Sequence, residues 1–347
     1  MASETTKKPH SYMNNKEIMV SVFCAVYNHE KYLRQCLDGF VMQKTNFAFE
    51  VIIHDDASTD HSADIIREYT QKYPNIFRPI YQEKNQYSQG ISFTKEYMLP
   101  LARGKYHASC EGDDYWCDEN KLQMQFDAME AHPECHLCVH KVRCVTEADE
   151  LLDKTYPGFA LDSGVLSSHE FLRIITSSYW FQTSSYFRRM EDMREFTLNP
   201  PEFRKVCDVG DVPGLLYCGS LGDVYYIDRE MSHYRTQSIG SWSMRQGKSL
   251  EKRKQHWHSM VRTYEEFDKY TEYRYSELVA KSIKRSQIEW YKCMASEKEY
   301  ARLLLKKGNK EGLKDENMKF RLFVFLRAYA PFLADFYYWL KGKISDE

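Results

Sequence analysis

Seven polar and acidic residues in the first third of the chain have types and spacing that could hold a phosphate-bearing ligand. They are Tyr27, Asn28, Asp55, Asp56, Glu111, Asp113 and Asp114, in the segments AVYN, HDDASTD and EGDDYW. Five carboxylates brought together repel one another strongly unless a cation lies among them. Mg²⁺ and Mn²⁺ favour oxygen ligands, and they usually take one or two protein carboxylates while keeping sites for water and a diphosphate. These residue types therefore predict a site for Mn²⁺ or Mg²⁺ together with a diphosphate.

Each acidic motif taken alone also has a structural explanation, because paired Asp residues at a strand end are common in turns and helix caps. The occurrence of both motifs after alternating strands and helices favours a functional interpretation. The first predicted strand is not followed by GxGxxG, and the chain contains no GxxxxGK[ST]. These absences argue against a dinucleotide fold and a P-loop NTPase. We therefore expect a metal ion to hold the phosphates.

The elements that must position these residues alternate between strand and helix. Strands are predicted at MVSVFCAVYN, FEVIIHDD, RPIYQ and GKYHASC, and helices in HEKYLRQCLDGFVMQ, before Pro74, at 91–103 and in KLQMQFDAMEAHP. Ser58, Thr59 or Asp60 can cap the second helix. Such alternation predicts an α/β fold with a mostly parallel sheet flanked by helices. The candidate residues follow its strands, and sheets of this kind bind ligands at the carboxyl ends of their strands.

The second half of the chain has a different pattern. Shorter strand candidates at SSYWFQTSSYFRR and DVYYIDREMSHYR indicate a mixed extension of the sheet. Beyond Ser249, Gly and Pro nearly vanish, which predicts a helical region. The run CHLCVHKVRC contains a CxxC pair that could suit zinc, but it alternates like a strand, so we interpret its cysteines as small buried hydrophobic residues.

Composition sets limits on the class of protein. With 347 residues and 43% hydrophobic content, the chain can form one enzyme-sized domain and an appendage. The 48 basic and 50 acidic residues give a formal charge of −2, which provides no general attraction to nucleic acid. Ten scattered cysteines and an N-terminal segment without a signal-peptide pattern favour a cytoplasmic location.

The aromatic segment FRLFVFLRAYAPFLADFYYWLKGK leaves two interpretations open. Arg327, Asp335 and Lys341 argue against a helix that spans a membrane. Residues 315–343 could form a helix lying in a membrane interface, which would place the protein peripherally on the inner face. The alternative is a helix that packs on the catalytic domain.

The sequence resembles the large inverting glycosyltransferase family called family two, which has a GT-A fold and assembles bacterial surface polysaccharides. The resemblance rests on VSVFCAVYNHEKYLRQCLDGFVMQ, EVIIHDDASTD, ARGKY and EGDDYWCDENKLQMQ, and it continues more weakly to residue 243. It implies a leader at 1–17, a GT-A domain at 18–245 and a helical region at 246–347. Within the domain it implies a nucleotide-sugar half at 18–144 and an acceptor half at 145–245.

The resemblance also implies roles for residues of the nucleotide-sugar half. Ala25, Tyr27 and Asn28 match the loop along the nucleotide base. Asp55 and Asp56 match a pair of which one member accepts a hydrogen bond from uracil.

EGDDYW stands where the family has its DxD motif. Asp113 and Asp114 match the metal and diphosphate ligands, and Trp116 matches a wall of the pocket. Glu111 replaces the usual leading Asp, which leaves open whether it touches the ribose.

Further along, the resemblance implies a catalytic base and further contacts to the metal and diphosphate. Asp211 matches the base, with Asp208 as the near alternative. Gln237 stands where the family often has a metal-binding His, and His233 is the alternative. Arg235 could pair with the diphosphate, or it could form a structural salt bridge.

The function implied is metal-dependent, inverting transfer of a hexose or N-acetylhexosamine from a UDP-sugar to a saccharide or lipid-linked saccharide acceptor. One alternative is a sugar nucleotidyltransferase, although no Gly-rich Arg/Lys signature follows the first strand. The other alternative is a catalytically silent subunit that binds nucleotide-sugars.

Overall fold

The computed structural model describes residues 17–177, 181–236 and 249–335. They form two compact units, and each unit has a hydrophobic core of its own. Residues 1–200 and 214–238 belong to the first, which we call the sheet unit. Residues 201–213 and 239–347 belong to the second, which we call the helical unit.

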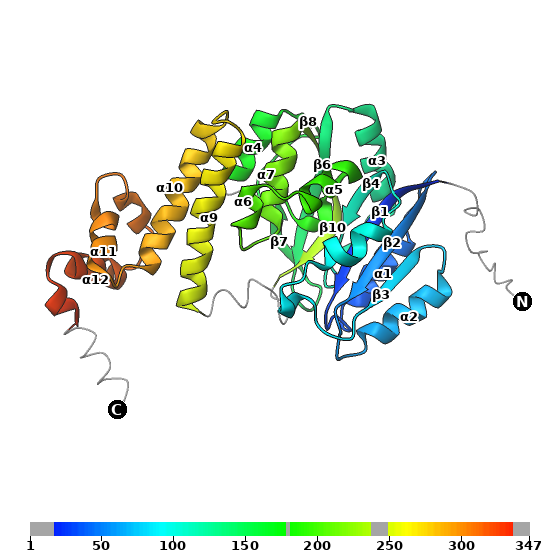
Figure 1. Ribbon diagram of the computed structural model, residues 1–347, viewed down its shortest axis with the longest axis horizontal. Coiled ribbons are helices and arrows are strands. Elements are labelled where there is room, and N and C mark those ends of the chain that lie inside the picture. The colour runs from blue at the N-terminus through cyan, green and yellow to red at the C-terminus, as the bar shows by residue number, and fades with distance from the viewer. Residues whose placement is uncertain (1–16, 178–180, 237–248, 336–347) are drawn as a thin grey trace, which may run out of the picture. The chain divides into compact units, whose positions relative to one another are not determined.

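One mixed sheet runs through the sheet unit, with neighbours in the order β3-β2-β1-β4-β9-β6-β10-β5 (Figure 1). The first four strands in this order are parallel, as expected from the alternating pattern. β9 then pairs antiparallel with both β4 and β6, and β7 and β8 pair with β6 and β10. The strands are β1 (Ile18–Val26), β2 (Ala48–Asp55), β3 (Phe77–Tyr81), β4 (Tyr106–Ser109), β5 (Tyr115–Trp116), β6 (Cys135–Val145), β7 (Leu151–Tyr156), β8 (Gly164–Leu166), β9 (Phe187–Arg189) and β10 (Asp223–Arg235).

The helices of the sheet unit bury apolar faces at the predicted spacing. Leu33, Leu37 and Phe40 of α1 are fully buried, and so is Leu122 of α3. The run CHLCVHKVRC forms the expected strand, β6, and its three cysteines are buried. The helices are α1 (Leu33–Val41), α2 (Ser62–Lys72), α3 (Lys121–Ala131), α4 (Ser168–Thr176) and α5 (Met190–Leu198).

Two expected elements differ in the structure. The predicted helix at 91–103 is only a π-helical turn, η2 (Thr94–Met98), followed by a 3₁₀ turn, η3 (Leu99–Leu101). Pro100 lies inside this segment and has no N–H to donate, which prevents a continuous α-helix. In the segment SSYWFQTSSYFRR, where a strand was expected, the described residues form the 3₁₀ turn η4 (Thr183–Ser185) and the short strand β9.

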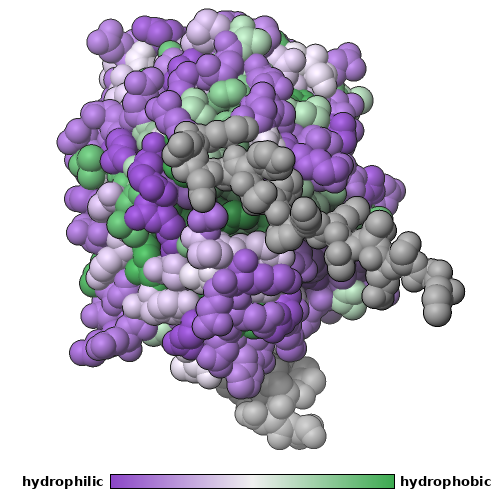
Figure 2. Space-filling model, turned by 90° about the vertical axis from the view of Figure 1, so that its right-hand side faces the viewer, coloured by the Kyte–Doolittle hydropathy of each residue, from purple (hydrophilic) through white to green (hydrophobic). Residues whose placement is uncertain are grey.

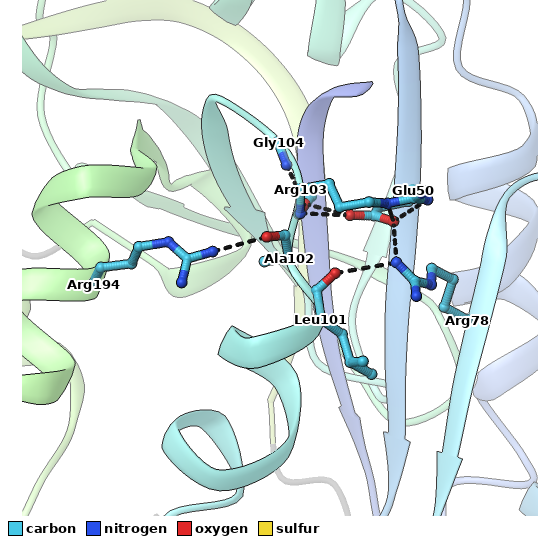
Figure 3. A network of polar contacts seen from close by, with 8 residues as sticks. Glu50, Arg78, Leu101, Ala102, Arg103, Gly104 and Arg194 are labelled. Carbon is cyan, nitrogen blue, oxygen red and sulfur yellow. Dashed lines mark hydrogen bonds and ion pairs between the residues drawn. The ribbon is translucent and has the colours of Figure 1, made fainter. Parts of the chain in front are cut away.

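A buried acid, Glu50, ties three strands of the sheet together (Figure 3). Glu50 of β2 accepts hydrogen bonds from Ser21 of β1, from Arg78 of β3 and from Arg103, which precedes β4. The next residue, Gly104, passes so close to β1 that a Cβ would lie 2.4 Å from the Ser21 nitrogen. This network fixes the positions in which the parallel strands start.

The helical unit confirms the predicted C-terminal helices. α6 (Glu202–Lys205) packs with α9 (Leu250–Tyr270), and α9 packs with α10 (Ser276–Cys293). α11 (Lys298–Leu305), η5 (Lys310–Leu313) and α12 (Met318–Tyr329) follow. α7 (Asp211–Leu221) begins in the helical unit and continues into the sheet unit.

The surface in Figure 2 is mostly hydrophilic, with hydrophobic residues confined to small areas. Among the helices in the described ranges, none is long and apolar enough to cross a membrane.

Candidate active site

The register of the parallel strands brings the three motifs to one edge of the sheet. Val26 at the end of β1 pairs with Asp55 at the end of β2. The Asp56 N–H then donates to the Val26 carbonyl at 2.9 Å, and the Gly112 N–H donates to the Ala25 carbonyl at 3.0 Å. The loops after β1, β2 and β4 are therefore immediate neighbours. This adjacency is what the positions of the motifs in the sequence predicted.

The loops after β1 and β2 are fastened to each other by side chains. The N–H of Asn28 donates to Ser58 Oγ at 2.9 Å, and Asn28 Oδ1 accepts from the Thr59 N–H at 2.7 Å. Asn28 has a φ of 57°, a left-handed conformation that Asn tolerates better than most residues. Of the three predicted caps, Asp60 is the one that accepts an N–H at the start of α2, from Ser62 to its Oδ1. Ser58 and Thr59 thus hold the β1 loop and do not cap the helix.

The paired acids after β2 have different surroundings. The two carboxylate oxygens of Asp56 accept the backbone N–H groups of Gln86 and Tyr87, at 2.6 and 3.1 Å. Asp55 is also buried, but its Oδ1 has no hydrogen-bond partner within the described ranges, and burial raises its pKa. The side chain of Tyr27 lies exposed on the loop after β1. Asp55 therefore retains acceptor capacity, whereas Asp56 holds the 85–87 loop.

The acids after β4 lie in a tight turn that leads into β5. The Asp114 N–H donates to the Glu111 carbonyl at 3.0 Å, and the Glu111 side chain is exposed. Asp114 is only 2% exposed, and its Oδ1 accepts the Arg235 N–H at 2.8 Å. Burial and the negative charge of Asp113 raise the pKa of Asp114 well above its ordinary range.

A divalent cation fits this pair of acids. A cation beside Asp114 would offset both its burial and its repulsion from Asp113, the two effects that raise its pKa. No cluster of three or more candidate ligands forms in the part of the chain that the structure describes. Mg²⁺ and Mn²⁺ are commonly held by one or two carboxylates and substrate phosphates, so two acids suffice. Asp113 and Asp114 are the residues that would hold it.

For Arg235 the sequence left open a diphosphate contact or a structural salt bridge, and in the structure its guanidinium contacts the protein. Its Nε donates to the Asp113 carbonyl, Nη1 to the carbonyls of Thr146 and Glu147, and Nη2 to Gln35 Oε1, at distances of 2.8 to 3.1 Å. Every nitrogen of the guanidinium therefore has a protein acceptor. This arrangement favours a positioning role, in which Arg235 orients the loop that carries Asp113.

His233 and Gln237 are the two alternative metal contacts predicted near the end of β10, and the structure describes His233. Both ring nitrogens of His233 are in use, since Nδ1 lies 2.7 Å from the Tyr115 hydroxyl and Nε2 lies 2.8 Å from Glu230 Oε1. The Tyr115 hydroxyl donates in turn to Asp149. His233 is therefore committed to a protein network. Gln237 lies outside the described residues.

The two candidate bases belong to the helical unit, where their environments differ. Asp208 Oδ1 lies 3.0 Å from His256 Nδ1 and accepts from Ser259 Oγ at 2.8 Å. Burial favours the neutral form of Asp208, but these partners outweigh it and lower the pKa. Asp211 begins α7, and Oδ1 accepts the N–H of Val212. Burial raises the pKa of Asp211, and a raised pKa makes a carboxylate a stronger proton acceptor than an ordinary Asp.

Two further residues were misjudged or missed in the sequence. Trp116 is not a pocket wall: it is 1% exposed and packs edge-on against Phe40 at a centroid distance of 4.8 Å. His29 was not singled out, yet its Nδ1 is buried without a partner in the described ranges. A Cβ on Gly112 would approach that nitrogen to 2.8 Å, so only glycine allows the turn before Asp113 to pack on His29. The one available signal was the position of His29 directly after Asn28.

Known proteins share both sequence and fold with this chain. The protein-family model described as "Glycosyl transferase family 2" matches residues 21–183. The uncharacterized protein Rv1520 of Mycobacterium tuberculosis (strain ATCC 25618 / H37Rv) is 35% identical over 228 residues, which are 64% of this chain and 60% of that protein. The chain therefore spans less than two thirds of the length of that relative.

Two solved structures establish the fold. S. aureus TarS 1-349 in complex with UDP-GlcNAc aligns with a TM-score of 0.52 and 13% identity, covering 90% of this chain and 88% of that chain. Mannosyltransferase PcManGT from Pyrobaculum calidifontis in complex with GDP-Man and Mn²⁺ aligns with a TM-score of 0.51 and 15% identity, covering 91% and 85%. The fold is that of the GT-A glycosyltransferases. Residues 21–183 therefore resemble glycosyltransferase family 2 in sequence, and the fold of the chain agrees with this resemblance.

Proposed function

We propose that this chain transfers a hexose or an N-acetylhexosamine from a UDP-sugar to a saccharide acceptor, with inversion at the anomeric carbon. One observation carries the proposal. Three adjacent parallel strands deliver Tyr27, Asp55 and the pair Asp113–Asp114 to one edge of the sheet. This arrangement offers an exposed ring for a base, an unsatisfied acceptor and a place for a cation beside a diphosphate.

The nucleotide base would lie along the loops after β1 and β2. Asp55 Oδ1 is a buried acceptor without a partner in the described part of the chain, and it can take an N–H from the base. The N–H groups of both uracil and guanine suit such an acceptor. The two related structures contain UDP-GlcNAc and GDP-Man, so the proposal of UDP needs a direct comparison of donors.

The acceptor hydroxyl is a weak nucleophile and needs a base within hydrogen-bond reach. We assign that role to Asp211, whose raised pKa suits it, and we assign Asp208 to holding α9. Asp211 would take the proton as the hydroxyl oxygen attacks the anomeric carbon and the bond to the diphosphate breaks. A single displacement inverts that carbon. A divalent cation held by Asp113 and Asp114 would neutralise charge on the departing diphosphate.

For the acceptor we propose a region of the chain and a class of molecule. We assign the donor to residues 18–144 and the acceptor to residues 145–245, with a saccharide or lipid-linked saccharide as the acceptor in polysaccharide assembly. All ten cysteines are free thiols, which supports a reducing, cytoplasmic location. Contact of residues 315–343 with the inner face of a membrane would bring the enzyme to a lipid-linked acceptor.

A donor panel tests the function. UDP-, GDP- and dTDP-sugars are incubated with the protein in Mn²⁺, in Mg²⁺ or in EDTA, and release of the nucleoside diphosphate is followed. A transferase should slowly hydrolyse one preferred donor, and only with metal. Release of pyrophosphate from a nucleoside triphosphate and a sugar phosphate would instead indicate a nucleotidyltransferase. Tight donor binding with no release would indicate a silent subunit.

A further inference from the structure

One side of α12 carries large hydrophobic side chains that are exposed. Met318, Leu322, Phe325 and Tyr329 are exposed by 82, 52, 52 and 64%. At a helical turn of about 100° per residue, their positions fall within about 60° of one another. We call these four residues the α12 stripe. A contiguous apolar surface of this kind marks an interaction site more often than an accident of the fold.

The α12 stripe is not the side of α12 that packs in the core of the helical unit. Phe323, Val324 and Ala328 lie on the opposite side of α12, and they are 8, 0 and 0% exposed in a core that α11 shares. Asn317 caps the helix by accepting the Phe320 N–H at 2.9 Å. α12 is therefore held by its own core and cap. The α12 stripe adds apolar surface for which packing inside the unit gives no reason.

The charged side chains of α12 itself are all basic. Lys319 and Arg321 are exposed, and their positions on the helix flank the α12 stripe on its two sides. The sequence contains no Asp or Glu from Asn317 to Ala334. Long basic side chains beside an apolar stripe can reach outward to phosphate groups while their stems stay in the apolar layer. This pattern is that of a helix that lies in the headgroup region of an anionic membrane.

We propose that the α12 stripe docks the helical unit on an anionic phospholipid surface, with Lys319 and Arg321 at the lipid phosphates. A second copy of the chain fits this face less well. A symmetric contact of stripe on stripe would bring the cations of both copies together, and α12 has no acidic residue to pair with them. The docking itself does not depend on catalysis, and it rests on the proposed function only as the reason why the enzyme would need a membrane.

Vesicle flotation of the full chain tests the proposal. The full chain should float with phosphatidylcholine vesicles that contain phosphatidylglycerol, should float less at high salt, and should not float with phosphatidylcholine alone. Leu322→Gln with Phe325→Gln should reduce recovery by about tenfold or more, because two apolar side chains leave the interface. Lys319→Gln with Arg321→Gln should remove the preference for the anionic lipid.

The matched control is Leu198→Gln with Leu250→Gln, since both leucines are 48% exposed and belong to helices other than α12. This control should float like the unaltered chain, and circular dichroism checks that all variants fold. Equal recovery of the stripe variant and the control would overturn the proposal. The proposal would also be overturned if the unaltered chain never floated but self-associated in light scattering, and if the stripe variant abolished that self-association. Donor hydrolysis without vesicles should be the same in all variants, so its absence throughout would count against the proposed function and not against docking.

Discussion

Two pairs of acids in this chain each contain one carboxylate that the fold uses and one with acceptor capacity left. Asp56 is saturated by two backbone N–H groups, while the neighbouring Asp55 keeps an unpartnered oxygen within the described structure. Asp208 is held by His256 and a serine hydroxyl, while Asp211 accepts the N–H of the next residue, Val212, through Oδ1. All four residues are Asp, so the hydrogen-bond partners of each carboxylate, and not its residue type, distinguish the acids that hold the fold from the candidates for binding and proton transfer.

The first pair predicts a division between binding and stability. Asp55→Ala should weaken donor binding by about 10- to 100-fold, because a hydrogen bond to a charged acceptor contributes about 1.5–3 kcal/mol. Asp56→Ala should mainly lower the melting temperature, since it leaves two backbone N–H groups unpaired at about 1–3 kcal/mol each. Calorimetric titration and thermal unfolding measure the two effects. Equal effects of both substitutions on donor affinity would refute the division.

The second pair predicts a pH profile. Asp211 must be ionised to accept a proton, so transfer should fall as pH decreases through its raised pKa, above the ordinary Asp value near 3.9. Asp211→Asn should reduce the transfer rate by about 10²- to 10⁴-fold while sparing donor binding. Asp208→Asn, the matched control, should keep most transfer and lose stability. Near-normal transfer by Asp211→Asn would assign the base to another carboxylate.

At the scale of elements, the Glu50 network should matter for stability and not for chemistry. Burial alone would raise the pKa of Glu50, but Arg103 and Arg78 outweigh it and lower the pKa. A lowered carboxyl pKa stabilises the fold above the unfolded value near 4.3, and this contribution is lost as pH falls through the folded pKa. Glu50→Gln should therefore cost about 3–5 kcal/mol near pH 7 and less below pH 4, measured by urea unfolding. A cost that did not change with pH would contradict this explanation.

Much of the fold could be predicted from the sequence because its signals are local. The apolar runs and the helical spacing of the first half predict β1 to β4 and α1 to α3, and chain order predicts that their acidic ends meet. The helix predicted at 91–103 was wrong because Pro100 prevents a continuous α-helix in spite of the apolar spacing of the segment.

The direction of individual side chains in the site could not be predicted. β10 changes register against β6 at Ile227/Glu230 and again at Glu230/Ser232. Each irregularity alters which face of the strand a later residue occupies, and the sequence does not mark it. His233 and Arg235 follow these irregularities, and both face protein partners. Trp116 was also expected at the pocket, and it is a core residue in the structure.

At the scale of the whole molecule, each of the two compact units contains acids to which we assign a role. Asp113 and Asp114 belong to the sheet unit, whereas Asp211 belongs to the helical unit, three residues before α7 enters the sheet unit. Mutations should therefore be able to impair donor binding and proton removal separately. The proposed chemistry also requires a metal ion at the sheet unit, whichever acceptor is used.

Thermal unfolding with UDP-sugar and Mn²⁺ tests that requirement most directly, because a ligand at 100 times its Kd stabilises the native state by about 2.7 kcal/mol. The account predicts that donor and metal together raise the melting temperature of the unaltered chain, that EDTA removes the increase, and that Asp114→Asn folds normally but shows none. An equal increase for Asp114→Asn, or one that persists in EDTA, would contradict the metal and diphosphate site at EGDDYW.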